Sequence, residues 1–264
     1  MPHLLIDIGN SFAKYTMYDA GKFSSVKKVT TNSLELNDNI ALLLKESSVI
    51  PTGIILVSVA NEKLTNNIIK SLESYFKLSV KNIETQASAF GVTCGYRDYE
   101  QLGNDRWVVM LGAFNSVDGK AKTIPMMIFD CGSVITVDVV NRSGMHVGGW
   151  MMPNTQLMAS ALEQKSEGIK LSLIKKELKA GVNNNKQKAL DEIGRSTFEC
   201  VELGHRLAVV GFIQQCMERA KKKLGIEPSY IFTGGGANEI KEMLDIDVEL
   251  RSNLIFDGLK LFIE

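Results

Sequence analysis

The first thirty residues carry a pattern of apolar and polar positions that predicts strands joined by short turns. Apolar stretches fall near residues 3–9, 12–18 and 23–29, with small residues between them. β-branched and aromatic residues favour strands, whereas glycine and asparagine favour tight turns. The first break, Gly9-Asn10-Ser11, is followed by strand-forming residues and not by a helical repeat. The pattern therefore indicates a hairpin, not the strand-to-helix phosphate loop of a dinucleotide-binding fold.

Further along the chain, predicted strands and helices alternate, which is typical of an α/β fold. In the first half the predicted elements are a helix near 38–47, a strand at 53–60, a helix at 61–76, a strand at 78–83 and a helix at 104–118. In the second half they are strands at 123–130, 133–140 and 145–151, a helix from Pro153, a long helix around 189–222, a strand, glycine turn and helix start at 229–240, and a terminal helix.

An internal repeat divides the chain. The segments LIDIGNSFAKYTMYDAGK and IFDCGSVITVDVVNRSGM align without a gap, and three of their positions are identical at one constant spacing: Asp7 with Asp130, Gly9 with Gly132, and Gly21 with Gly144. Such self-similarity is the mark of a duplicated unit. We therefore expect two lobes of similar topology, residues 1–118 and 119–264, with a cleft between them.

Composition narrows the function classes. The 264 residues are 45% hydrophobic, and 30 basic residues balance 30 acidic ones, so the formal net charge is +0. A neutral chain has no electrostatic footprint for nucleic acid or an anionic membrane, and we expect neither as a partner. The sequence also has no long apolar run and no basic start with a cleavage signal, which predicts a cytoplasmic protein. Its four cysteines lack metal-site spacing, so we expect free thiols. Its three histidines are scattered, so we expect structural or surface roles for them.

The first hairpin turn has the chemistry of a phosphate site. Small residues at 9–11 let several backbone N–H groups approach one anion, and Lys14 can add a positive charge. Asp7 would be repelled by phosphates unless a hydrated cation lay between them, which is the arrangement of a Mg²⁺–nucleotide complex. A plain hairpin with a capping aspartate is the alternative for one copy alone. The second copy, and the bare glycine backbone of TGGGAN at 233–238, favour a nucleotide cleft between the two expected lobes.

The order of two phosphate hairpins and a later glycine loop resembles the actin, hexokinase and acetate kinase superfamily, whose lobes have a ribonuclease H-like fold. Within it, the chain resembles the type III pantothenate kinases. The segments that carry this resemblance are DIGNSFAK at 7–14, GYRDYEQLGNDRW at 95–107, DCGSVITVD at 130–138, GGWMMP at 148–153, GRSTFECVELG at 194–204 and TGG at 233–235.

The resemblance implies an ATP-dependent kinase that converts pantothenate to 4′-phosphopantothenate, the first step of coenzyme A biosynthesis. It implies Asp105 as the catalytic base and Asp130 as a ligand of a monovalent cation, K⁺ or NH₄⁺. It assigns ATP binding to Asp7, Ile8, Gly9, Asn10, Ser11, Phe12, Ala13, Lys14 and Ser133, with Mg²⁺. It assigns pantothenate binding to Tyr96, Gly103, Asn104, Asp105, Arg106 and Thr197. It also implies a homodimer.

Simpler interpretations stay open for these residues. Asp105 suits the first turn of a helix on electrostatic grounds alone, and Arg106 could form a surface ion pair. Thr197 could bond back to its own helix, and Tyr96 could be an ordinary loop aromatic. At the level of function, the alternatives are a non-catalytic accessory or regulatory protein, and a kinase for another small hydroxyl compound.

Three positions depart from the family pattern. Tyr99 stands in place of a common proline, Ser133 in place of threonine, and Asn154 in place of glycine. Serine keeps the hydroxyl of threonine. Asparagine tolerates a left-handed backbone better than other non-glycine residues, so we expect the turn at 154 to survive in that conformation.

Overall fold

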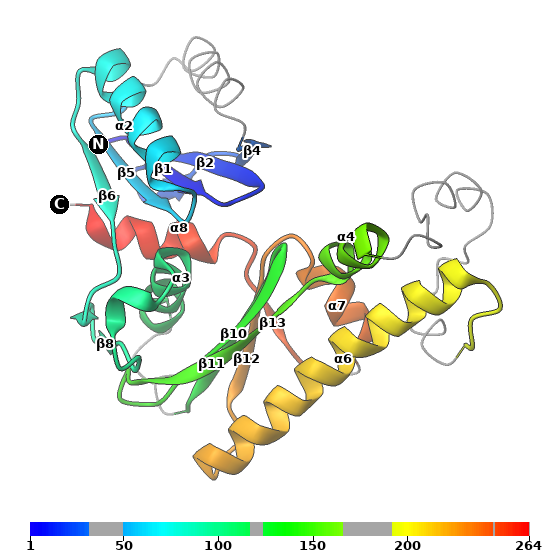
Figure 1. Ribbon diagram of the computed structural model, residues 1–264. Helices are drawn as coiled ribbons and strands as arrows, with labels where there is room; N and C mark the ends of the chain where they lie inside the picture. Colours follow the sequence, from blue (N-terminus) through cyan, green and yellow to red (C-terminus); the bar gives the residue numbers. More distant parts are fainter. Residues whose placement is uncertain (32–49, 117–123, 166–191, 245, 264) are drawn as a thin grey trace. The chain divides into compact units, whose positions relative to one another are not determined.

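The computed structural model describes residues 1–31, 50–116, 124–165, 192–244 and 246–263. The chain divides into two compact units, shown with their elements in Figure 1. Unit 1 comprises Met1–Lys122, Ser143–His146 and Asn253–Glu264; unit 2 comprises Thr123–Arg142 and Val147–Ser252. The helix expected near 38–47 and the boundary expected at 118/119 lie outside the described residues.

Unit 1 is built on a mixed sheet whose strands run in the order β3-β2-β1-β5-β6, with β4 also paired to β2. β1 is antiparallel to β2 and parallel to β5, and β5 is parallel to β6. The strand bounds are β1 His3–Ile8, β2 Phe12–Asp19, β3 Lys22–Phe23, β4 Lys27–Thr30, β5 Gly53–Ser58 and β6 Val80–Ile83. A separate hairpin joins β7 (Ser88–Ala89) to β8 (Val92–Thr93).

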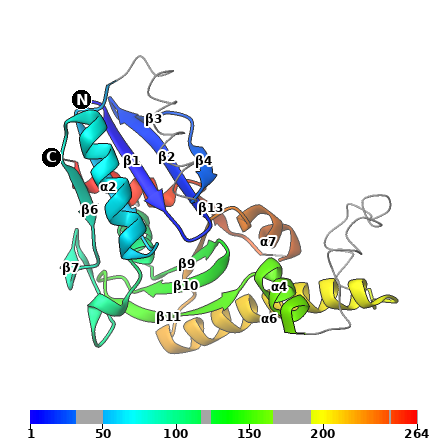
Figure 2. The same cartoon turned by 45° about the horizontal axis from the view of Figure 1, so that its top comes forward.

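Helices cover both faces of this sheet (Figures 1 and 2). The helices of unit 1 are α2 Glu62–Phe76, η1 Tyr99–Gln101, α3 Asn104–Asn115, α8 Leu254–Leu259 and η5 Lys260–Phe262. From α2, Ile68 and Leu72 pack against the even-numbered residues of β1, including Ile6. Because side chains alternate along a strand, Asp7 points to the other face, where α8 packs against β1 and α3 packs against α8.

Unit 2 has a five-stranded sheet in the order β11-β10-β9-β12-β13. Its elements are β9 Met126–Cys131, β10 Val134–Val140, β11 His146–Pro153, α4 Thr155–Lys165, α6 Thr197–Leu224, β12 Ser229–Thr233, α7 Ala237–Met243 and β13 Glu249–Leu250. β10 is antiparallel to β9, whereas β12 is parallel to both β9 and β13. If β4 is left out, the strands of the two units correspond one to one: β3-β2-β1-β5-β6 in unit 1 matches β11-β10-β9-β12-β13 in unit 2. In each unit the strands lie in the order third, second, first, fourth and fifth along the chain.

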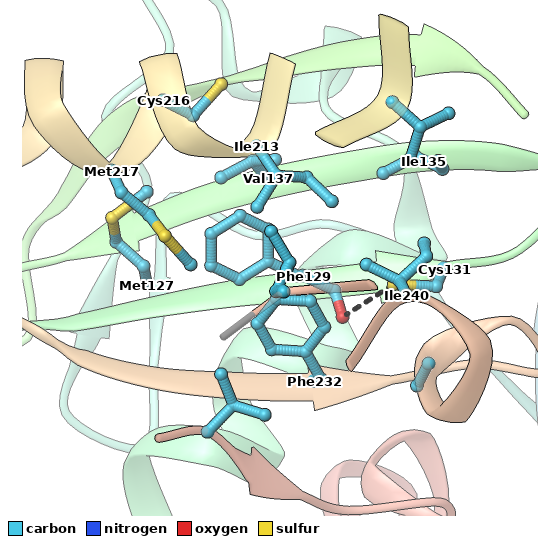
Figure 3. Close-up of a cluster of buried hydrophobic side chains, with 14 of the residues drawn as sticks. Met127, Phe129, Cys131, Ile135, Val137, Ile213, Cys216, Met217, Phe232 and Ile240 are labelled. Carbon is cyan, nitrogen blue, oxygen red and sulfur yellow. Dashed lines mark hydrogen bonds between the residues drawn. The ribbon is translucent and has the colours of Figure 1, made fainter. Parts of the chain in front are cut away.

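The core of unit 2 lies between its sheet and two of its helices (Figure 3). Phe129 and Phe232 occupy neighbouring positions on β9 and β12, and their rings stack with centroids 4.5 Å apart. Ile213 of α6 and Ile240 of α7 belong to the same cluster of buried side chains as this aromatic pair. Asp130, which follows Phe129 on the strand, consequently faces away from this core.

Two sequence expectations need correction. The repeat does not run without a gap, because Ile8 pairs with Ala13 in the first hairpin whereas Cys131 pairs with Ile135 in the second. The first turn is one residue longer, so the residue facing the aspartate is Lys14 in one copy and Thr136 in the other.

The second correction concerns the end of the chain, which we expected in the second lobe. Asn253–Glu264 belongs to unit 1. The reason is close packing of α8 on α3: a Cβ at Gly258 would overlap the Val108 carbonyl, and a Cβ at Gly112 would overlap the Leu254 carbonyl. Only glycine at both positions lets the two backbones approach this closely.

Candidate functional site

Asp7 lies at the end of β1, opposite Lys14 of β2. The aspartate is 8% exposed, and the Lys14 ammonium lies 4.0 Å from its Oδ2. A carboxylate so deeply buried requires compensation by positive charge or hydrogen bonds. The pair places a carboxylate and a half-buried ammonium group beside the turn that was expected to hold phosphates.

That turn is fixed from behind by Thr31, a residue that the sequence analysis missed. The Thr31 hydroxyl donates to the Gly9 carbonyl at 2.8 Å, and its backbone N–H donates to the Ser11 carbonyl at 3.1 Å. Thr31 itself is 5% exposed. Two carbonyls of the turn are therefore occupied on the side of Thr31. No sequence signal marks Thr31, because Thr31 and Gly9 are 22 residues apart in the sequence and are brought together only by the fold.

Asp105 lies in the first turn of α3, the position that the sequence analysis expected for it. Its Oδ1 accepts a hydrogen bond from the Arg106 backbone N–H at 2.7 Å. A Cβ on Gly103 would lie 2.7 Å from the same oxygen, too close for any side chain. Gly103 is thus required for this placement of the carboxylate, and the helix N-terminus favours its negative charge.

Arg106 is a buried residue, and the open alternative of a surface ion pair is wrong. Its side chain is held against Tyr96: the guanidinium Nη1 donates to the Tyr96 hydroxyl at 2.9 Å. The Tyr96 ring in turn stacks on His146, with centroids 5.7 Å apart and planes inclined by 21°. Tyr96 is therefore more than a loop aromatic, and His146, which is 1% exposed, supports it.

Asn104 begins α3, and its side chain points into the protein. Its Oδ1 accepts from the Thr85 backbone N–H at 2.9 Å, and its Nδ2 donates to the Ser58 carbonyl at 3.2 Å. The substrate contact expected of Asn104 is thus left to its backbone or its second amide hydrogen.

In unit 2, Asp130 packs under the glycine loop at 234–236. Gly234 has φ +86°, and a Cβ there would overlap the Asp130 carboxylate, so this position requires glycine on both counts. The Gly236 N–H donates to the Cys131 carbonyl at 2.9 Å, which fixes the loop to the end of β9. Burial and the neighbouring Asp130 carboxylate raise the pKa of the Cys131 thiol, so this thiol stays neutral.

Asn154 does not adopt the expected left-handed conformation, since the positive-φ non-glycine residues of the described chain are Ala20, Lys77 and Phe90. Instead its Oδ1 accepts from the Leu157 N–H at 2.9 Å, as a helix N-cap does. Its Nδ2 donates to the Gly132 carbonyl at 3.1 Å, and its N–H donates to the Ser133 carbonyl at 3.1 Å. Asn154 therefore ties α4 to the turn that carries half-buried Ser133.

Thr197 is exposed at the first position of α6, after the N-cap Ser196. It lies in unit 2, whereas Tyr96, Gly103, Asp105 and Arg106 lie together in unit 1. The open alternative of a helix-interior threonine is wrong, because Thr197 is in the first turn.

The Asp7 carboxylate is a candidate ligand for a hydrated metal ion. The described residues contain no group of three or more histidine, cysteine, aspartate or glutamate side chains that could hold a metal. Mg²⁺ commonly takes one or two carboxylates and completes its shell with water and phosphate oxygens. Asp7, at the edge of the phosphate-type turn, has the chemistry for that role.

No helix in the described parts of the chain is both long and apolar enough to cross a bilayer.

Comparison with known proteins gives consistent matches. The family model described as type III pantothenate kinase matches residues 3–219. A type III pantothenate kinase of Pseudomonas fluorescens (strain SBW25) is 31% identical over 261 residues, covering 98% of this chain and 97% of its own. One from Leptothrix cholodnii is 26% identical over 266 residues, covering 98% and 95%.

Solved structures match the fold. A Campylobacter jejuni protein titled a putative Baf family transcriptional activator has a TM-score of 0.58 at 20% identity, covering 98% of this chain and 96% of its own. MreB5 of Spiroplasma citri has a TM-score of 0.51 at 11% identity, covering 99% and 95%. Likenesses at such identities bear on the fold alone, and this fold is the actin-like one that the sequence predicted.

Proposed function

The chain belongs to the type III pantothenate kinase family, and from that premise we propose how its residues divide the work of the reaction. The enzyme transfers the terminal phosphoryl group of ATP to pantothenate, giving 4′-phosphopantothenate in the first step of coenzyme A biosynthesis. It uses ATP together with a divalent metal ion. The observation that carries the assignment of roles is the start of α3, where Gly103 leaves room for the Asp105 carboxylate beside an anchored Arg106.

Asp105 is the general base. It accepts the proton of the pantothenate hydroxyl as the oxygen of that hydroxyl forms its bond to the phosphoryl group and the bond to ADP breaks. A carboxylate is suited to this role because it is a hydrogen-bond acceptor that orients the hydroxyl before taking its proton. The helix N-terminus supports its ionised form.

Arg106 is the clamp for the pantothenate carboxylate. A guanidinium group has five N–H donors in a planar array, which matches the two oxygens of a carboxylate. The hydrogen bond to Tyr96 and the stacking of Tyr96 on His146 keep this array in one orientation. Thr197, exposed at the start of α6, is proposed to complete the substrate site.

Residues 7–14 hold the phosphates of ATP, and Asp7 orients the hydrated Mg²⁺. Lys14 supplies positive charge, while the small residues of the turn allow close approach to its backbone. Ser133, in the corresponding turn of unit 2, is a further ATP contact. The Asn154 bonds to Gly132 and Ser133 support the geometry of that turn.

Asp130 is a ligand of a monovalent cation, K⁺ or NH₄⁺. In the first hairpin the position facing the aspartate is a lysine, whereas in the second it is Thr136, which brings no charge. A bound cation would supply in unit 2 the positive charge that Lys14 supplies in unit 1.

The enzyme is cytoplasmic and forms a homodimer. In the dimer, the second copy of the chain covers exposed apolar side chains of unit 2. The edge strand β11 exposes Trp150 and Met151, and α6 exposes Leu207, which is 51% accessible. Apart from their own stretch of helix, no described atom lies within 4 Å of where a Cβ would stand at Gly204 or Gly211 of α6, which would permit close approach of a partner helix. Leu207→Glu should shift the elution of the protein from dimer to monomer, whereas an unchanged elution would argue against this surface.

An ADP-release assay on the purified protein tests the reaction. We expect ADP release to depend on pantothenate, to exceed that with other hydroxylated acids, and to require K⁺ or NH₄⁺ in addition to Mg²⁺. Turnover with a different hydroxyl acid alone would indicate another substrate, and no turnover with any would favour an accessory role. Equal rates in Na⁺ and K⁺ buffers would contradict the role of Asp130 only.

A further inference from the structure

The side chain of Asn104 connects two segments that are far apart in the sequence. On one side, its Oδ1 accepts from both the backbone N–H and the hydroxyl of Thr85, at 2.9 and 3.1 Å. On the other side, its Nδ2 donates to the Ser58 carbonyl at 3.2 Å. Asn104 directly precedes Asp105, so these bonds hold the first residue of the helix that carries the proposed base.

The Ser58 carbonyl belongs to a peptide group that also holds the proposed phosphate-binding turn. The N–H of that same group, on Val59, donates to the Ile8 carbonyl at 3.0 Å. A peptide group is planar and rigid, so its two ends move together. Ile8 lies between Asp7 and Gly9, and the Ser58–Val59 peptide therefore links the start of the turn to the side chain of Asn104.

The far side of the connection is also fixed. Thr85 is 8% exposed, and its single hydroxyl hydrogen is shared between Asn104 Oδ1 and the Leu102 carbonyl, whose oxygen lies 2.8 Å from the hydroxyl. The Ser58 side chain bonds to Thr65 of α2 at 2.7 Å, which anchors the end of β5. These hydrogen bonds form one connected network whose ends are anchored, and the members of such a network support one another.

We propose that Asn104 is a positioning residue: through the Ser58–Val59 peptide it sets the place of Asp105 relative to the phosphate-binding turn. This inference rests on the proposed roles of Asp105 and residues 7–14. All the groups involved lie within unit 1. The consequence is kinetic, since a misplacement of about 1 Å between reacting groups can cost on the order of 100-fold in rate.

The test compares Asn104→Ala with Asn115→Ala in steady-state kinetics and thermal unfolding. Asn115 ends the same helix, and its side chain also bonds to two backbone carbonyls, those of Phe90 and Leu111. Both variants should lose similar stability. Asn104→Ala should lower kcat by about 10- to 100-fold while the KM of each substrate changes less than about threefold, and Asn115→Ala should keep its kcat.

A conservative variant separates the bond to Thr85 from the bond to Ser58. It also replaces Asn104→Ala in the test if the alanine variant does not fold. Asn104→Asp keeps an acceptor for Thr85 but cannot donate to the Ser58 carbonyl, so it should be as slow as the alanine variant. Thr85→Val keeps the Nδ2 bond to Ser58 and should lose much less of the rate. An active wild type with an unchanged kcat in the folded Asn104 variants would overturn this inference alone, whereas a wild type that does not phosphorylate pantothenate would overturn the proposed function.

Discussion

The guanidinium of the buried Arg106 donates a 2.9 Å hydrogen bond to the hydroxyl of the half-buried Tyr96. The bond restrains the guanidinium group of Arg106. The next residue of α3, Trp107, is buried in the core. An arginine restrained in this way loses little further freedom when it binds a carboxylate. Its orientation is therefore a property of the free protein.

The first prediction concerns this pair. Tyr96→Phe removes the hydroxyl but keeps the ring on His146, so the KM for pantothenate should rise several-fold, with kcat and the KM for ATP little changed. Arg106→Ala removes the clamp itself, and loss of a charge-assisted hydrogen bond should raise the pantothenate KM by about 10- to 100-fold. Steady-state kinetics on both variants check this. An Arg106→Ala enzyme with a normal pantothenate KM would refute the clamp.

A second prediction concerns the bond behind the phosphate-binding turn. Thr31→Val keeps the shape of the side chain but loses the donor to the Gly9 carbonyl, so the turn should loosen and the KM for ATP should rise by about 3- to 10-fold, the equivalent of one neutral hydrogen bond. Thr52→Val is the matched control, because the Thr52 hydroxyl also donates to a backbone carbonyl, that of Pro2, at 3.0 Å. Equal ATP affinities in the two variants would contradict the role of Thr31.

A third prediction tests the N-cap at Asn154. Asn154→Asp keeps an acceptor for the Leu157 N–H, whereas Asn154→Ala removes it and should lower the free energy of unfolding by about 1 kcal/mol. Both variants lose the donor to the Gly132 carbonyl, so both should bind ATP more weakly. Urea unfolding and ATP titration measure the two effects separately. An alanine variant as stable as the wild type would show that the cap contributes nothing.

A fourth prediction follows from the cysteines. Burial raises the pKa of Cys216 to about 11, and burial together with Asp130 raises the pKa of Cys131, so neither thiol forms its reactive thiolate at pH 8. Cys200 is exposed. Iodoacetamide at pH 8 should therefore label Cys200 in the folded protein and spare Cys131 and Cys216, while all become labelled in urea. Rapid labelling of Cys131 in the native protein, read by mass spectrometry, would count against the packing of the 234–236 loop.

The sequence was enough to predict both hairpins, the α/β alternation and the helix that begins at Asn104, because each has a local signal of periodicity or turn chemistry. It could not predict the register of the second hairpin. A gapless alignment treats the two turns as equal, and only the pairing of Cys131 with Ile135 shows that one turn is shorter.

The hydrogen bonds that support the site could not be predicted from the sequence. Thr31 and Asn104 act through bonds to Gly9 and Ser58, partners distant along the chain, and neither bond leaves a periodic or motif signal. Asn154 was recognised as unusual, but its role was misjudged because asparagine serves both left-handed turns and helix N-caps. The His146 contact was missed for a related reason: a lone histidine gives no sign of the ring that stacks on it.

The most direct test of the account is the steady-state kinetics of Asp105→Asn. Asparagine keeps the size of aspartate and an oxygen for the Arg106 N–H, but it cannot accept the proton of the pantothenate hydroxyl. Loss of a general base typically costs on the order of 10²- to 10⁴-fold, so kcat should fall by that factor while the KM values for pantothenate and ATP change little. A folded Asp105→Asn enzyme with a kcat near that of the wild type would contradict the assignment of Asp105 as the base.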